Sequence, residues 1–103
     1  MGQRMRRFVI VAALAAFTGT AAQAGTIERA CLKADRKAAS RSLCGCIQDA
    51  ADATLNNRDQ RLAAKFFKKP SMAQDIRQSD RAVHEAFWKR YKEFGATAQT
   101  YCG

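Results

Sequence analysis

Histidine, proline, acidic side chains and long apolar runs are all scarce in this sequence. It has one histidine, one proline and nine acidic residues among 103, against 18 lysines and arginines. We find no Ser/His/Asp arrangement, no glycine-rich phosphate loop and no repeated pair of carboxylates, which argues against an enzyme. The longest apolar run, Phe8 to Phe17, covers 10 residues, about half of what a membrane-spanning helix needs.

Residues 1–24 have the three parts of a secretory signal peptide. Three arginines within the first seven residues precede the apolar run, and the small residues after it end in an A-x-A box closed by Ala24. No lipobox cysteine follows the run, which favours a soluble product over a lipoprotein. We therefore expect cleavage after Ala24 and a bacterial periplasmic or secreted protein, with an uncleaved amphipathic anchor as the alternative.

The chain that remains after this cleavage, residues 25–103, has 79 residues and is expected to form one domain. A domain of this size buries only about 60% of its unfolded surface, so apolar burial and conformational entropy nearly cancel. It contains all four cysteines: Cys31, Cys44, Cys46 and Cys102. In an oxidising compartment we expect them to form two disulfides that supply the missing stability.

Apolar periodicity predicts an all-α fold, a small bundle of four or five helices, because no sustained alternation of apolar and polar residues indicates a strand. The expected helices run from Ile27 into the 33–39 region, from after Ser42 to Leu55, from Arg58 to Lys68, from Ser71 to Gln78 and from Asp80 to Tyr101. The predicted N-caps are Thr26, the pair Asn56-Asn57, and Ser79, and Pro70 ends the third helix.

The last expected helix carries the longest apolar stripe. Six residues fall within an arc of about 80° and are expected in the core: Val83, Phe87, Tyr91, Phe94, Ala98 and Tyr101. We expect Gly95 to loosen or divide this helix near its end. His84 lies at the edge of the stripe beside Trp88, where a histidine at the core boundary without a functional role is expected.

The two cysteines of the C-G-C sequence, Cys44 and Cys46, need different partners. On a helix, positions i and i+2 lie about 200° apart, so a bridge between them would be badly strained. If the first two helices form a hairpin, Cys31 lies level with Cys46, which leaves Cys44 for Cys102; we prefer this pairing. If residues 35–42 form a loop instead, Cys31 pairs with Cys44, and Cys46 with Cys102.

Two other functions would use the same cysteines. As a redox couple, Cys44 and Cys46 would form a strained and therefore oxidising ring, but the usual redox motif has two intervening residues and follows a strand. As a metal site, Cys31, Cys44, Cys46 and His84 would offer ligands suited to copper or zinc, but the usual zinc spacings are absent. We therefore predict neither a metal nor a cofactor.

The expected mature chain is basic: 15 lysines and arginines against nine acidic residues give it a net charge of +6. The candidate anion-binding residues are Lys65, Lys68, Lys69, Arg77, Arg81, Lys89, Arg90 and Lys92. Phe66 and Phe67, between the first lysines, are expected in the core. Taken singly, each cation is better explained as part of a solvated face, but together they could attract an acidic surface.

The kind of partner follows from the compartment and from the absence of a nucleic-acid-binding module. No such module is recognisable in the sequence, and an exported protein rarely meets nucleic acid. We therefore expect no nucleic acid, and instead an anionic component of the envelope: a lipid headgroup, a cell-wall polymer or an acidic protein.

Two segments, "ACLKADRKAASRSLCGCIQ" and "DIRQSDRAVHEAFWKRYKEFGATAQTYCG", resemble a family of short exported proteins of alphaproteobacteria, some of which carry the automatic label "arginine transporter". The resemblance includes the four cysteines and covers most of the chain after the leader, but it implies no residue roles. One short leader cannot form a solute pathway through a bilayer, so the label supports at most an accessory to a transport system.

The sequence therefore predicts an exported, small helical binding or interaction module of the cell envelope with a basic face. One alternative is a thiol-disulfide or metal-handling protein that uses Cys44 and Cys46. The other is an accessory to a transport system or a structural component of the envelope.

Overall fold

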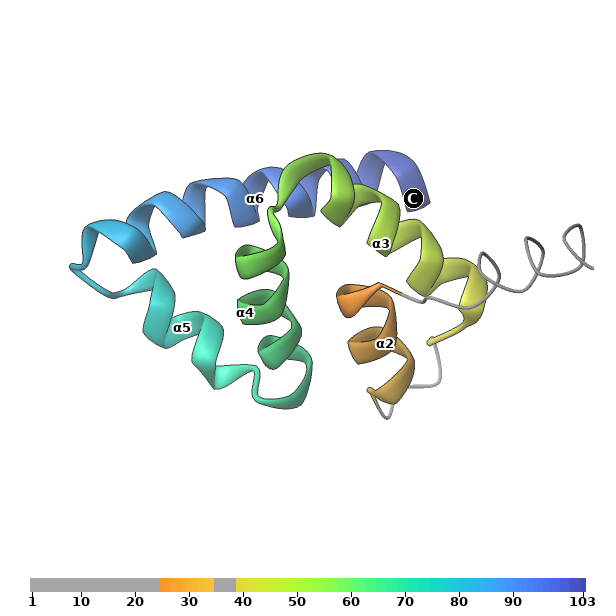
Figure 1. Ribbon diagram of the computed structural model, residues 1–103, viewed down its shortest axis with the longest axis horizontal. Coiled ribbons are helices and arrows are strands. Elements are labelled where there is room, and N and C mark those ends of the chain that lie inside the picture. Colours follow the sequence, from red (N-terminus) through yellow and green to blue (C-terminus); the bar gives the residue numbers. More distant parts are fainter. Residues whose placement is uncertain (1–24, 35–38) are drawn as a thin grey trace, which may run out of the picture.

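The computed structural model describes residues 25–34 and 39–103, and within these residues it has five helices and no strand (Figure 1). The helices are α2 (Thr26–Lys33), α3 (Arg41–Thr54), α4 (Asn57–Lys68), α5 (Ser71–Arg77) and α6 (Ala82–Cys102). The predicted all-α fold is confirmed. The predicted signal peptide, residues 1–24, lies outside the described residues.

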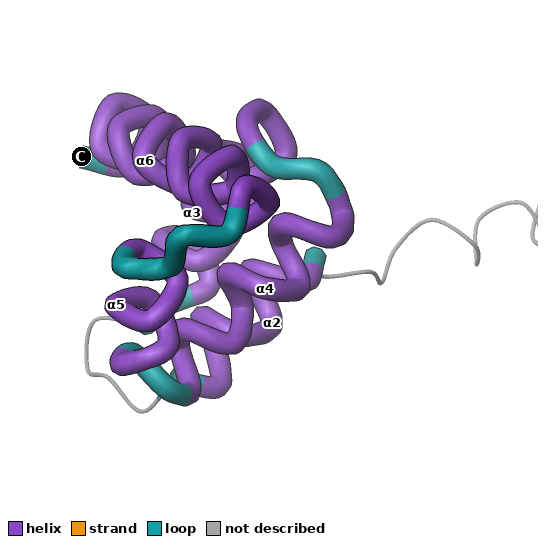
Figure 2. The backbone as a smooth tube through the Cα atoms, turned by 90° about the vertical axis from the view of Figure 1, so that its left-hand side faces the viewer, coloured by secondary structure: helices purple, strands orange, loops and turns teal. Residues whose placement is uncertain are grey.

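The helices are arranged in two layers. α3 and α6 lie against each other along the top of Figure 1, and α5, α4 and α2 stand in a row below them. The view turned by 90° also places α6 and α3 above the other helices (Figure 2). α3 packs on α2 as well as on α6, and α4 packs on both α2 and α5. α3 therefore lies between α2 and α6.

Side-chain caps determine where α3 and α4 begin. Ser40 Oγ accepts a hydrogen bond from the Leu43 N–H (3.1 Å), and Asn56 Oδ1 accepts one from the Asp59 N–H (2.8 Å). Both bonds satisfy backbone donors that the first turn of a helix leaves without a partner. The predicted stop and restart at Asn56 is confirmed, whereas α3 begins two residues earlier than predicted because Ser40 supplies its cap.

Two other predicted caps are wrong. Thr26 already belongs to α2, and the residue before it makes no side-chain cap. α6 begins at Ala82, beyond the position that Ser79 would cap. Ser79 Oγ instead accepts a hydrogen bond from the Arg81 N–H (3.2 Å) and lies 2.6 Å from Nδ1 of His84, which is half-buried. Ser79 thus bonds to the backbone of the loop and to the side chain of His84 in the first turn, and not to a backbone N–H of that turn.

The core is small and contains short side chains. Its buried apolar residues are Ile27, Ala50, Ala51, Leu55, Ala63, Phe66, Ile76, Phe87 and Phe94, of which three are alanine. The largest fully buried side chains of the described residues are only Ile27 and Cys44. Since burial of a large apolar side chain contributes about 1.5–3 kcal/mol, this interior leaves little surplus over the entropy cost of ordering the chain.

Aromatic rings join α6 to α4. Phe66 lies edge-on to Phe87 and to Tyr91, with ring centroids 5.9 and 5.2 Å apart, an arrangement that the ring quadrupoles favour. Burial in this cluster raises the pKa of the Tyr91 phenol. Phe67 is half-buried rather than part of the buried core.

The apolar stripe of α6 is buried only in its middle turns. Phe87 and Phe94 are buried, but Val83 and Tyr101 are 61% and 54% exposed, so the prediction that they lie in the core is wrong. The stripe assumes a partner surface along the whole helix, whereas α6 packs mainly on α3 and meets α4 through Phe66, and Val83 and Tyr101, near its two ends, stay exposed. Gly95 does not divide α6, which runs through it without a break.

The two disulfides join α3 to the helices on either side of it. Cys44 bonds to Cys31 of α2, and Cys46 bonds to Cys102 at the end of α6, with Cα–Cα distances of 5.6 and 5.8 Å. The need for different partners is confirmed, but the preferred pairing is wrong and the alternative pairing is correct. The physical reason is that α2 ends at Lys33, eight residues before α3 begins, so the two helices do not form the tight hairpin on which the preference depended.

Buried glutamines link α2, α3 and α4. Gln48 Oε1 accepts a hydrogen bond from the Glu28 N–H (2.9 Å). Gln48 Nε2 donates to Asp52 Oδ1 (2.8 Å) and to Gln60 Oε1 (2.9 Å), and Gln60 Nε2 donates to the Leu55 carbonyl (3.3 Å). A buried polar network of this kind rigidifies its surroundings only when its members are paired. It holds α2 in place together with the Cys31–Cys44 bond.

Gly25→Ala is expected to lower the free energy of unfolding by about 1–3 kcal/mol, the cost of leaving a buried polar group unpaired. A Cβ at Gly25 would overlap the carboxamide of Gln48, which cannot move without losing its bonds to Glu28 and Gln60. Urea denaturation measures the change. Gly95→Ala is the control, because its Cβ would meet nothing within 4 Å and alanine favours a helix. Equal stabilities of the two variants would contradict the expectation.

Candidate functional site

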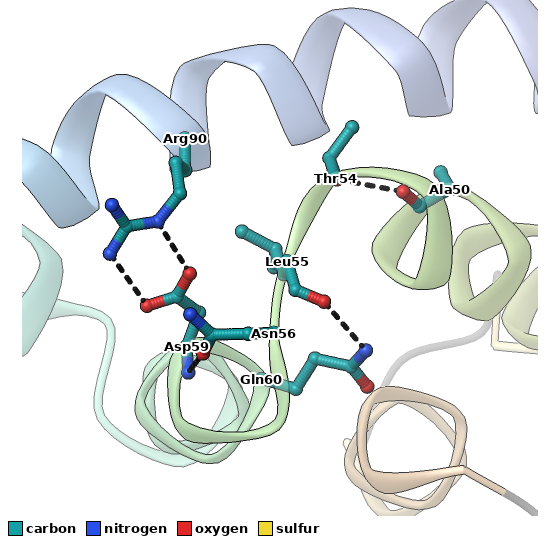
Figure 3. Close-up of polar contacts among 7 residues, drawn as sticks. All are labelled: Ala50, Thr54, Leu55, Asn56, Asp59, Gln60 and Arg90. Atoms are coloured by element: carbon teal, nitrogen blue, oxygen red, sulfur yellow. Dashed lines mark hydrogen bonds and ion pairs between the residues drawn. The ribbon is translucent and has the colours of Figure 1, made fainter.

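Arg90, one of the candidate anion-binding residues, is paired with an acidic side chain of the protein. Its Nε donates to Asp59 Oδ2 (2.6 Å) and its Nη2 donates to Asp59 Oδ1 (3.0 Å), a bidentate arrangement shown in Figure 3. The hydrogen bond to Asp59 raises the pKa of Arg90 above its ordinary value. The Asp59 side chain is 4% exposed and that of Arg90 is 40% exposed. Arg90 therefore joins α6 to α4, and its charge is matched internally.

The other seven candidate cations are exposed but do not share one face. They are Lys65 and Lys68 in the last turn of α4, Lys69 after it, Arg77 at the end of α5, Arg81 before α6, and Lys89 and Lys92 on α6. In Figure 1 the C-terminal end of α4 lies at the bottom of the molecule and α6 lies at the top. The structure thus divides the predicted basic face into separate groups.

Lys68 is the one candidate that lines a groove between α2 and α4. The groove has a volume of about 680 Å³ and is lined by Thr26, Arg29, Ala30, Lys33, Ala34, Ala64, Phe67 and Lys68. The four residues of α2 have the spacing i, i+3, i+4 and i+7, so they form one helix face, and Ala34 directly follows the helix. The remaining three residues come from the C-terminal end of α4.

The rim of this groove is positive and its floor is apolar. The charged lining residues are exposed and the apolar ones are half-buried. We call the first set the rim cations: Arg29, Lys33 and Lys68. We call the second set the apolar floor: Ala30, Ala34, Ala64 and Phe67. No acidic residue is among the described lining residues, and positive charge beside a low-dielectric wall produces a field that favours anions over cations.

Two of the rim cations lie at the ends of helices. Lys33 is in the last turn of α2 and Lys68 in the last turn of α4, where a positive charge also offsets the negative end of the helix dipole. α2 and α4 run in the same direction in Figure 1, so both lysines lie at the same end of the groove. Neither forms an ion pair with another described residue.

The cysteines and the histidine proposed for redox or metal chemistry are placed differently. Each cysteine of the C-G-C pair is bonded to a distant partner, and none of the described cysteines is free. Across residues 25–34 and 39–103, no group of three histidine, cysteine, aspartate or glutamate side chains is arranged to hold a metal ion. His84 lies against Ser79 at the start of α6.

Sequence reasoning identified Lys68 but missed Arg29 and Lys33. Their i, i+4 spacing indicates that they share a helix face, and this was the available signal. The sequence does not show that this face lies beside the end of α4, because the two helices meet only through the folding of the whole chain.

Comparison with known proteins adds no further assignment, because no family model, curated protein or solved structure matches this chain. Among the helices that the structure describes, none combines the length and the apolar character needed to cross a membrane.

Proposed function

We propose that this protein is an exported binding module whose groove between α2 and α4 holds an anionic component of the bacterial envelope. The observation that carries the proposal is the pair of lysines at one end of the groove, Lys33 and Lys68, with no acidic residue among the described residues that line it. Export is supported by the two disulfides, which are typical of oxidising compartments. The net charge of +6 of residues 25–103 favours approach to an anionic surface.

The resemblance to short exported alphaproteobacterial proteins is part of this proposal, but arginine as the ligand is not. An arginine ligand would bring its own guanidinium charge to the rim cations, and like charges repel. An anionic envelope component has the charge that the described lining residues lack.

Binding to lipid vesicles tests the proposal. The exported, oxidised protein is expected to bind vesicles that contain anionic phospholipid and not zwitterionic vesicles. Salt is expected to weaken the binding, because it screens exposed charges. The Lys33→Gln/Lys68→Gln variant is expected to bind about 30-fold more weakly, since each lysine near an anionic surface contributes about 1 kcal/mol. Co-sedimentation at several salt concentrations measures both effects.

The Lys89→Gln/Lys92→Gln variant is the matched control, because it removes the same charge from exposed positions on α6. It is expected to keep most of the affinity. Equal losses in the two variants would show that net charge, and not the groove, causes binding. Retention on anionic vesicles that salt does not change would contradict the proposal as a whole.

A further inference from the structure

We infer that the ligand of this groove is a single-chain amphiphile: an alkyl chain on the apolar floor with one anionic head among the rim cations. The inference rests on the proposed function and adds the apolar part of the ligand to it. It is carried by the juxtaposition of exposed cations and half-buried apolar side chains in one groove.

The apolar floor needs a partner that a bare anion does not supply. Its four side chains are only half-buried, although they line a groove of about 680 Å³, a volume within the range of about 300–1,000 Å³ that is usual for small-molecule sites. Covering apolar surface contributes about 25 cal/mol per Å². A polymer of sugars and phosphates would pair with the rim cations but leave the apolar floor exposed to water. The same holds for an acidic side chain of a protein.

The direction of the helices indicates where the head and the chain lie. Lys33 and Lys68 are at the same end of the groove, and Thr26 belongs to the first turn of α2 at the other end. An anionic head between the two lysines therefore leaves the chain to extend along α2, past Ala30. α2 has eight residues, about 12 Å at 1.5 Å per residue, so a chain of medium length spans this wall.

Calorimetric titration with alkyl phosphates of increasing chain length tests the inference, with inorganic phosphate as the chain-free probe and each amphiphile below its micelle concentration. Affinity is expected to rise about fourfold for each methylene that the groove buries and to level off between octyl and dodecyl phosphate. If decyl phosphate binds no more tightly than inorganic phosphate, the inference is overturned. The proposed function then stands or falls separately, because the vesicle experiment depends on charge.

Ala64→Leu separates the contribution of the floor from that of the rim. Its added carbons occupy the floor, so affinity is expected to level off at a shorter chain while the affinity for inorganic phosphate stays unchanged. Lys33→Gln/Lys68→Gln is expected to have the opposite effect. Every alkyl phosphate binds more weakly to this variant, while the gain in affinity for each methylene stays the same. Ala30→Leu repeats the floor test from α2. If both leucine variants leave the chain-length series unchanged, the chain does not lie in the groove.

Two further ligands identify the source of the amphiphile. Tighter binding of decyl phosphate than of decanoate indicates a single-chain phospholipid, and the reverse order indicates a free fatty acid; either order supports the inference. Decyltrimethylammonium has the same chain with a positive head. Binding of this cation as tightly as the two anions would overturn the inference, because the rim cations would then have no part in recognition.

Discussion

Replacing Cys46 and Cys102 together by alanine is expected to lower the free energy of unfolding by about 4 kcal/mol. Their bond joins positions 56 residues apart, and in the chain-entropy model a loop of this length restricts the unfolded chain by about that amount. Small domains have about 5–15 kcal/mol of stability in total, and the core of this one includes three alanines among nine buried residues. Urea denaturation followed by circular dichroism measures the loss.

The Cys31→Ala/Cys44→Ala variant lacks the crosslink between two positions that are 13 residues apart. Its free energy of unfolding is expected to fall by about 3 kcal/mol, because the shorter loop restricts the unfolded chain less. Treatment of the unsubstituted protein with a strong reductant is the control for the substitutions themselves. If the reduced and the oxidised protein unfold at the same urea concentration, the disulfides do not supply the stability that the small core lacks.

Arg90→Met is expected to lower the free energy of unfolding by about 3 kcal/mol, the lower end of the cost of leaving a buried charge without its partner. The variant removes both donors from the Asp59 carboxylate, which is 4% exposed. Asp59→Asn is expected to cost only about 1 kcal/mol, because the charge that it leaves unpaired, on Arg90, is 40% exposed and reaches water. Urea denaturation of both variants measures this asymmetry.

The double variant Arg90→Met/Asp59→Leu is the control for that expectation. Replacing a whole ion pair by apolar side chains is often close to neutral, so the double variant is expected to be more stable than Arg90→Met alone. Equal, small losses of stability in the two single variants would show that Asp59 does not behave as a buried charge that needs Arg90. The two residues would then be an ordinary surface ion pair of little energetic value.

Local signals in the sequence predicted most of the helices because each signal acts within a few residues. Asn56 ends one helix and caps the next, Pro70 stands between α4 and α5, and the C-G-C spacing requires two different disulfide partners. Such features depend on backbone geometry and not on distant contacts.

Contacts between distant segments explain what the sequence did not predict. The disulfide pairing depends on where α2 ends, which the apolar pattern left open between residues 33 and 39. The exposure of Val83 and Tyr101 depends on which turns of α6 have a neighbour. The candidate site shows the same limit: Arg90 looks like a surface cation until Asp59, 31 residues away, is placed beside it.

The crosslinks and the proposed binding site are physically connected. α2 has eight residues, fewer than the about 12–15 that an isolated helix needs to be even marginally stable. The Cys31–Cys44 bond and the hydrogen bond from Glu28 to Gln48 hold this short helix against α3. Its position there makes it one wall of the groove, opposite the end of α4.

The most direct measurement is an amide ¹H–¹⁵N chemical-shift titration of the oxidised protein with decyl phosphate. We predict that the largest shift changes occur at the residues of the groove, above all Arg29, Lys33, Phe67 and Lys68, and that Lys89 and Lys92 on α6 change little. Changes centred on α6, or spread evenly over all exposed lysines and arginines, would contradict a specific anion-binding groove between α2 and α4.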